Sequence, residues 1–140
     1  MEKIYLLLSN NPMAAEKYQE DRDIELSYHE EDSFRDVLVR ARDLIHRGWH
    51  LMTHPQASNL KPNQCPYKTV FLSKGRAAES EEREIELIEA AIAAVDKFTR
   101  GMQAPRWTEK ALRDFQTVDL SVIESALNSS LLHQMILNHQ

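Results

Sequence analysis

Glycine is scarce in this chain, and its scarcity excludes two large classes of enzyme in their usual form. Only three glycines, Gly48, Gly75 and Gly101, occur among the 140 residues. Dinucleotide fingerprints and phosphate-binding loops need several glycines close together, because a backbone that approaches a phosphate closely has no room for side chains. We therefore expect neither kind of site.

The chain also has few cysteines and fewer basic than acidic residues. The single cysteine, Cys65, cannot form an internal disulfide, which favours a reducing compartment. The 22 acidic residues outnumber the 17 basic residues, for a formal charge of -5. Binding to nucleic acid needs a concentrated positive surface, so we expect no nucleic-acid partner.

Long apolar runs are absent as well. The run from Ile4 to Leu8 has five residues, fewer than the apolar region of a signal peptide and far fewer than the about 20 that span a bilayer. We expect a cytoplasmic protein with no membrane partner. Three histidines, His46, His50 and His54, could suggest a metal site, but Gly48 interrupts the helical spacing that ligand pairs need. We predict no metal and no cofactor.

The patterns that are present predict an α/β domain over residues 1–100. Apolar runs bounded by turns predict strands over 3–8, 24–28, 49–53 and 67–73. Apolar stripes predict helices over 12–20, between Ser33 and Gly48, and over 80–100. Because strands and helices alternate, we predict a small, mostly parallel sheet of about four strands in the order 2-1-3-4, flanked by helices.

A helical extension is predicted over residues 101–140. Thr108 is expected to cap a short helix, and Asp119 or Ser121 to start a last helix that runs towards His139. Apolar residues cover more than one face of that last helix, so we expect it to pack on the domain and on a partner, such as a second subunit of a homodimer.

The loop from Thr53 to Tyr67 is the most distinctive segment. Three prolines stiffen it, and its side chains are mostly polar. Loops that a rigid scaffold holds in place often carry function. In the order 2-1-3-4, this loop would face the turn Ser9-Asn10-Asn11 across the crevice between the first and third strands, which is where open α/β sheets bind ligands.

We predict that a small anionic or polar ligand binds in this crevice. Unpaired backbone N–H groups at the turn favour an anion, His54 can exchange a proton near neutral pH, and Lys61 supplies a positive charge. The predicted ligand-binding residues are Ser9, Asn10, Asn11, His54, Ser58, Lys61 and Asn63. The alternative is that the turn only caps a helix and that the loop bonds to itself.

Three segments of the sequence resemble the GrdX family. They are Ser9 to Pro12, Arg42 to Gly48, and the spacing from Thr53-His54-Pro55 through Lys61-Pro62-Asn63 to Pro66-Tyr67. GrdX proteins are small and are associated with gene clusters of glycine, sarcosine and betaine reductases. The resemblance, over about residues 3 to 98, implies an intracellular accessory protein of amino-acid reduction with no established activity.

The sequence departs from the family pattern at two places. Gln56 to Asn59 replaces a segment that usually contains glycine, and Gln64-Cys65 stands where Glu-Thr is usual. A catalytic thiol at Cys65 would therefore be particular to this protein. Three functions stay open: a ligand-binding protein, a non-catalytic interaction or oligomerisation module that uses the last helix, and an enzyme that works through His54 with Lys61 or Cys65.

Overall fold

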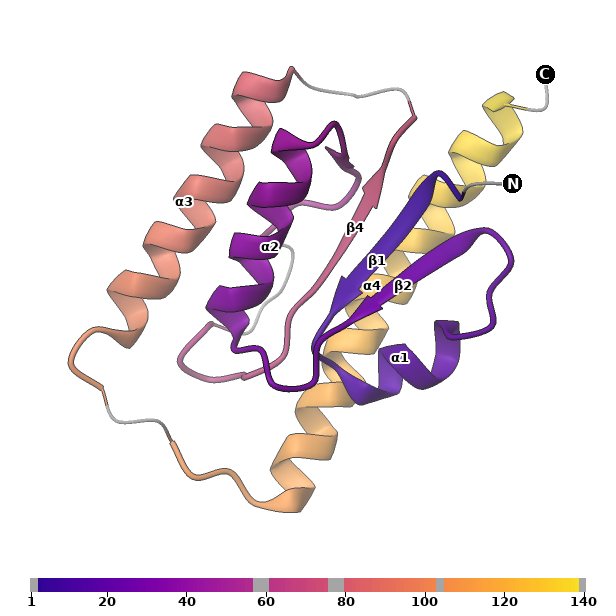
Figure 1. Ribbon diagram of the computed structural model, residues 1–140. Coiled ribbons are helices and arrows are strands. Elements are labelled where there is room, and N and C mark those ends of the chain that lie inside the picture. Colours follow the sequence, from indigo (N-terminus) through magenta and orange to yellow (C-terminus); the bar gives the residue numbers. More distant parts are fainter. Residues whose placement is uncertain (1–2, 57–60, 76–79, 103–104, 139–140) are drawn as a thin grey trace.

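One four-stranded sheet carries helices on both of its faces (Figure 1). The computed structural model describes residues 3–56, 61–75, 80–102 and 105–138, and for residues 129–138 it describes only the backbone. The strands are β1 (Tyr5–Ser9), β2 (Ile24–Tyr28), β3 (His50–Leu51) and β4 (Thr69–Ser73). The helices are α1 (Pro12–Tyr18), α2 (Phe34–His46), α3 (Glu81–Thr99) and α4 (Glu109–Asn138).

Two apolar cores lie on opposite faces of the sheet. Leu6 and Leu8 of β1 belong to the core beneath α2 and α3, whereas Tyr5 and Leu7 belong to the core beneath α1 and α4. Figure 1 shows the same division, with α2 and α3 on one side of the sheet and α1 and α4 on the other. Successive side chains of a strand point to opposite faces, so an unbroken aliphatic run marks a strand that is covered on both sides.

The predicted strand order and the mostly parallel sheet are wrong. The observed order is β2-β1-β4-β3, and only the pair β1 and β2 is parallel. β4 runs antiparallel to both β1 and β3. All five residues of β4 are buried, whereas β3 has two half-buried residues. β4 therefore takes the central place, and the predicted crevice between β1 and β3 does not form because β4 separates them.

Most of the predicted helices and strands are confirmed, and their capping residues explain why. Asn11 Oδ1 accepts a hydrogen bond from the Met13 amide, 3.0 Å away, at the start of α1. Ser33 and Asp36 form a reciprocal capping box at the start of α2. Gly48 follows the end of α2 with a φ of +100°, a conformation that favours glycine. β2 has the bounds that the sequence predicts.

The two predicted C-terminal helices are one continuous helix, α4. No glycine or proline lies between Thr108 and Gln140 to interrupt it. Asp119 does not cap a second helix, because its carboxylate accepts hydrogen bonds from side chains of other elements. Ile123 and Leu127 of α4 are buried in the core that α4 shares with α1. The division of the chain near residue 100 into a domain and an extension stays a prediction.

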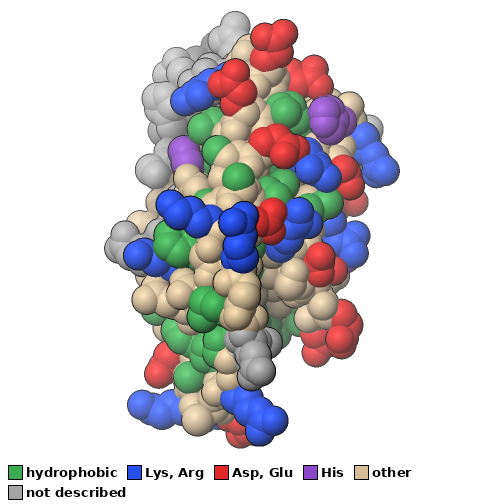
Figure 2. Space-filling view, turned by 90° about the vertical axis from the view of Figure 1, so that its left-hand side faces the viewer, with side chains coloured by type: hydrophobic (Ala, Val, Ile, Leu, Met, Phe, Trp, Pro, Cys, Tyr) green, Lys and Arg blue, Asp and Glu red, His purple; other side chains and the backbone are tan. Residues whose placement is uncertain are grey.

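The face on the α3 side carries charges of both signs (Figure 2). Two ion pairs cross from α2 to α3 on it: Arg35 Nε lies 2.8 Å from Asp96 Oδ1, and Arg42 Nη1 lies 2.9 Å from Glu89 Oε1. Exposed pairs of this kind contribute at most about 1 kcal/mol each, so they add little to the stability of the fold. None of the helices in the described part of the chain combines the length and the apolarity that crossing a bilayer requires.

Candidate functional site

A chain of hydrogen bonds lies where β1 ends and β4 begins. Ser9 and Thr69 are opposite each other in the sheet, and their hydroxyl oxygens are 2.8 Å apart. Thr69 Oγ1 donates its proton to Asp119 Oδ2 at 2.5 Å, so Ser9 must be the donor to Thr69. The Asn11 amide N–H in turn donates to Ser9 Oγ at 2.9 Å. The chain therefore runs in one direction and ends on the Asp119 carboxylate.

Asn11 ties the first turn to α4. Its side-chain Nδ2 donates to the Gln116 carbonyl and to Asp119 Oδ2, both at 2.9 Å, and its Oδ1 caps α1. The residue is fully buried. Sequence reasoning expected this amide to face a ligand, and the structure shows it holding α4 and orienting the Asp119 carboxylate.

Asn10 joins three loops in a similar way. Its Nδ2 donates to the carbonyls of Asp32 and Pro66, both at 2.9 Å, and its Oδ1 accepts from the Lys68 backbone amide at 2.8 Å. Its side chain is 3% exposed. Asn10 thereby fixes the start of β4 and the position from which the Lys68 side chain leaves the backbone.

Lys68 is a buried cation that the sequence analysis did not find. The residue is 4% exposed, and its Nζ lies 5.5 Å from the centre of the Phe34 ring. Within residues 3–56, 61–75, 80–102 and 105–138, no hydrogen bond or ion pair reaches this nitrogen. Burial lowers the pKa of Lys68 to about 8, and electrostatic attraction, chiefly to Asp119, acts against that lowering. The side chain is thus mostly protonated at pH 7.

Opposing effects act on the pKa of the Asp119 carboxyl. Burial raises its pKa above the ordinary value, while the hydrogen bonds from Thr69 and Asn11, and then the charge of Lys68, lower it. Asp119 and Lys68 therefore act on each other through space. The carboxylate has two donors of its own, whereas the ammonium has no hydrogen-bonded acceptor among the described residues.

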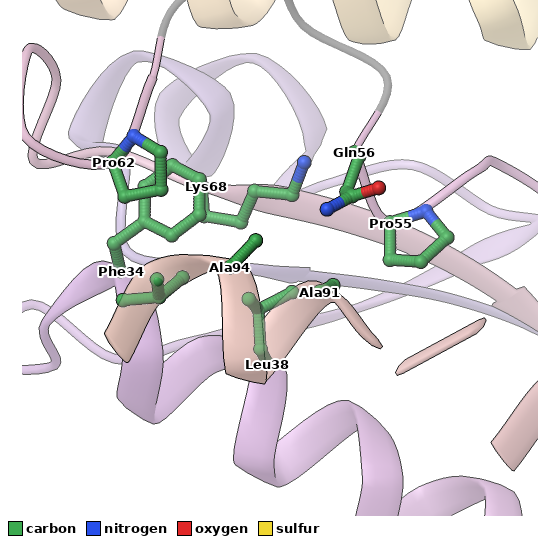
Figure 3. Close-up of a pocket in the computed structure, with 9 residues that line it drawn as sticks. Phe34, Leu38, Pro55, Gln56, Pro62, Lys68, Ala91 and Ala94 are labelled. Carbon is green, nitrogen blue, oxygen red and sulfur yellow. The ribbon is translucent and has the colours of Figure 1, made fainter. Parts of the chain in front are cut away.

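Two cavities meet at Lys68. The larger, of about 80 Å³, is lined by Lys68 and Gln56 and otherwise by apolar side chains, among them Leu38, Ala91 and Ala94. Figure 3 shows the Lys68 side chain extending past Phe34, with its nitrogen on the side of Gln56. The smaller cavity, of about 10 Å³, is lined by Thr53, His54, Thr69 and Asp119 among others. One water needs about 10–15 Å³, so only the larger cavity has room for several heavy atoms.

The predicted loop residues lie in separate places. His54 is exposed and lines the smaller cavity beside Asp119, and its Nδ1 accepts from the Gln56 amide at 3.0 Å. Lys61 is exposed, with its Nζ 5.1 Å from the centre of the Phe98 ring. Asn63 lines a third cavity, and Ser58 lies outside the described residues. The structure brings Ser9, Asn11 and His54 around Asp119, but it does not bring Lys61 or Asn63 there.

Cys65 is poorly suited to act as a nucleophile. Its thiol is buried, and Sγ donates to the Tyr67 carbonyl at 3.6 Å. Burial raises the pKa of the thiol to about 11. The thiolate is the reactive form of cysteine, so Cys65 stays unreactive near neutral pH.

His46, at the end of α2, and His50, in β3, lie near acidic residues. His50 Nδ1 lies 3.4 Å from Glu84 Oε2, and His46 Nδ1 lies 4.0 Å from Glu81 Oε1. Within the part of the chain that the structure describes, no group of three or more His, Cys, Asp or Glu side chains is arranged to hold a metal ion.

A family model described as GrdX-like protein matches residues 6–128. The chain belongs to the GrdX-like protein family. The match confirms the resemblance carried by the three sequence segments, and it reaches further than expected, into α4. Membership links the chain with gene clusters of the glycine reductase type. No match was found among curated proteins or among solved structures.

The buried network of this GrdX-like protein lies inside the matched range, from Ser9 to Asp119. Asp119 belongs to α4, beyond the range of the initial resemblance. The match therefore covers both the turn after β1 and α4, the helix to which this turn is hydrogen-bonded. Lys68 lies between them in the sequence.

Proposed function

We propose that this GrdX-like protein binds a small carboxylate at Lys68. The proposal rests on one observation: the Lys68 residue is almost completely buried, and no acceptor in the described part of the chain is hydrogen-bonded to its ammonium. A buried charge without a hydrogen-bonded partner costs free energy. The carboxylate of a ligand would supply the missing partner and remove that cost.

The lining of the larger cavity favours one class of carboxylate. Lys68 and Gln56 are its polar groups, and Leu38, Ala91 and Ala94 are among its apolar ones. A carboxylate that faces the ammonium would place a short alkyl group against the two alanines. The lining contains no acidic side chain, so the ammonium group of a free amino acid would lack a counter-charge there. We therefore expect acetate to bind more tightly than glycine.

The size of the cavity sets an upper limit on the ligand. About 80 Å³ holds only a few heavy atoms, whereas drug-sized ligands and cofactors occupy pockets of about 300–1,000 Å³. Nucleotides and coenzymes are therefore too large. Together with family membership, this favours an intracellular accessory protein of glycine- or betaine-type reductase metabolism that binds a small carboxylate of that metabolism.

A thermal-unfolding series with matched variants tests this function. Sodium acetate, glycine and sodium phosphate would be added at pH 7, with sodium chloride as the ionic-strength control. Acetate should stabilise the wild type and Lys61→Met, in which an exposed lysine is lost, but not Lys68→Met. At 100 times the dissociation constant the stabilisation is about 2.7 kcal/mol. Equal stabilisation of Lys68→Met by acetate would refute the assignment.

The pH dependence of binding provides a second test. Only the protonated form of Lys68 attracts a carboxylate, and its pKa is about 8. The association constant of acetate should therefore fall about tenfold for each pH unit above 8. An affinity that stays constant from pH 7 to pH 10 would mean that another group holds the anion.

We also propose that residues 101–140 form an extension that contributes to a homodimer through α4. α4 already buries Ile123 and Leu127 against the sheet, and its surface residue Val118 is 40% exposed. Further apolar residues follow in the sequence, including Leu131 and Leu132. Sedimentation should give a dimer for the wild type and a monomer after Leu131→Lys and Leu132→Lys; a monomeric wild type would exclude the dimer.

A further inference from the structure

A third cavity is separate from the Lys68 network. It has a volume of about 350 Å³, within the range of small-molecule sites. Its walls come from the start of α2, from the loop before β4 and from the connection between α3 and α4, and they include Phe34, Pro62, Asn63, Met102 and Trp107. Hydrophobic side chains reach the surface in the lower half of the face shown in Figure 2, at the end of the molecule where the α3–α4 connection runs in Figure 1.

Asn63, one of the residues that line this cavity, has a polar atom without a partner. Asn63 Oδ1 is buried, and no hydrogen bond reaches it in the part of the chain that the structure describes. A buried carbonyl oxygen without a donor is costly. The oxygen therefore marks a position where a ligand N–H would be stabilised.

The charges around the cavity indicate that the hydrogen-bond donor of the ligand is a cationic group. Asp32 is among the lining residues, and its carboxylate is already paired with Arg40. No Lys, Arg or His side chain lines the cavity, so an anion finds no counter-charge there. The Trp107 ring, packed edge-on against Phe115 with 6.3 Å between ring centres, adds an aromatic surface that attracts cations.

We propose that this cavity binds a small hydrophobic amine. The ammonium group donates to Asn63 Oδ1, and the apolar part of the ligand packs against Pro62, Met102 and Trp107. Phe34 and Pro62 form the wall that this cavity shares with the Lys68 cavity. Lys68 lines only the latter of these cavities, so the amine site has a lining of different charge from that of the carboxylate site.

Nuclear magnetic resonance can follow the site directly with benzylamine as the probe. The chain has two tryptophans, Trp49 and Trp107, and therefore two indole N–H signals. Benzylamine at pH 7 should shift the Trp107 signal, while the Trp49 signal, from the core beneath α2 and α3, should stay in place. Benzoate, which has the same ring and the opposite charge, should bind at least about tenfold more weakly because the lining holds no cation.

Two variants separate a binding role of Asn63 from a structural one. Asn63→Leu removes the unpaired acceptor, so it should raise the urea midpoint while weakening benzylamine binding about tenfold, the loss of one charge-assisted hydrogen bond. Lys68→Met should leave benzylamine binding unchanged, even where it abolishes acetate binding. The proposal is overturned if Trp107 does not respond, if benzoate binds as tightly as benzylamine, or if Asn63→Leu binds benzylamine with wild-type affinity.

Discussion

Replacing Lys68 with Met should stabilise the protein while removing its carboxylate site. Methionine has a similar length and is apolar, so it can occupy the same buried space against Phe34 without a charge. A substitution that strengthens the fold and weakens binding is typical of a residue kept for function. A lysine kept for structure would give the opposite result.

The expected gain follows from the change in protonation on folding. Folding lowers the pKa of Lys68 from its ordinary value of 10.5 to about 8. Each pH unit between these values corresponds to about 1.4 kcal/mol, so keeping the proton at pH 7 costs the folded state about 3 kcal/mol. The lost attraction between the ammonium and the Phe34 ring offsets about 1 kcal/mol. The net gain is about 2 kcal/mol.

The sign of the pH dependence gives a sharper test than the gain alone. Between pH 8 and pH 10.5 the unfolded wild type holds a proton that the folded wild type has released. The free energy of unfolding of the wild type therefore rises with pH across this window relative to Lys68→Met. The advantage of the variant should be largest near pH 7 and should disappear towards pH 10.5.

Urea unfolding followed by circular dichroism at pH 7 and at pH 10 measures both quantities. Lys61→Met is the matched control, because Lys61 is exposed and also lies over an aromatic ring, and its loss should lower the free energy of unfolding by at most about 1 kcal/mol. The reasoning is refuted if Lys68→Met is less stable than the wild type at pH 7, since the ammonium would then have a stabilising partner.

Three further predictions concern the surroundings of the site. Asn10→Ala should lower the free energy of unfolding by about 3 kcal/mol, because three hydrogen bonds are lost, and one of them leaves the Lys68 backbone N–H without an acceptor. A loss below about 1 kcal/mol in urea unfolding would contradict this. Cys65 should react with a thiol reagent at pH 8 only after unfolding, because burial holds its pKa at about 11; rapid labelling of the folded protein would contradict the burial. Ser33→Ala should cost about 1 kcal/mol and Ser33→Gly only a few tenths, because both variants lose the Ser33 hydroxyl of the capping box but glycine is favoured over alanine as an N-cap residue; no loss for Ser33→Ala on thermal unfolding would mean that the cap does not stabilise α2.

Local signals in the sequence predict the helices and strands well. Asn11, Ser33 and Gly48 mark helix ends because each acts through its own backbone or the next turn. The strand order could not be read in this way, because pairing depends on which strands are covered on both faces. Complete burial of β4 and the short length of β3 place β4 beside β1, and neither property follows from spacing.

The candidate site was harder to predict than the fold for the same reason. Sequence reasoning proposed Ser9, Asn11 and His54 as ligand-binding residues, but it did not consider Asp119, which Asn11 bonds directly and Ser9 reaches through Thr69. Asp119 looks like a helix cap in the sequence, whereas it lies inside α4 and contacts β4 and the first turn. Lys68 offers one local signal, a charged residue directly before a fully buried strand.

Titration of the Lys68 side chain by carbon-13 magnetic resonance tests the central claim most directly. The Cε signal reports protonation of Nζ, and Lys68→Met identifies it among the lysine signals. We predict a pKa of about 8 in the free protein and a higher value in saturating acetate, because a bound carboxylate stabilises the ammonium. A pKa near 10.5 that does not respond to acetate would contradict both the buried, unpaired ammonium and the binding of a carboxylate to it.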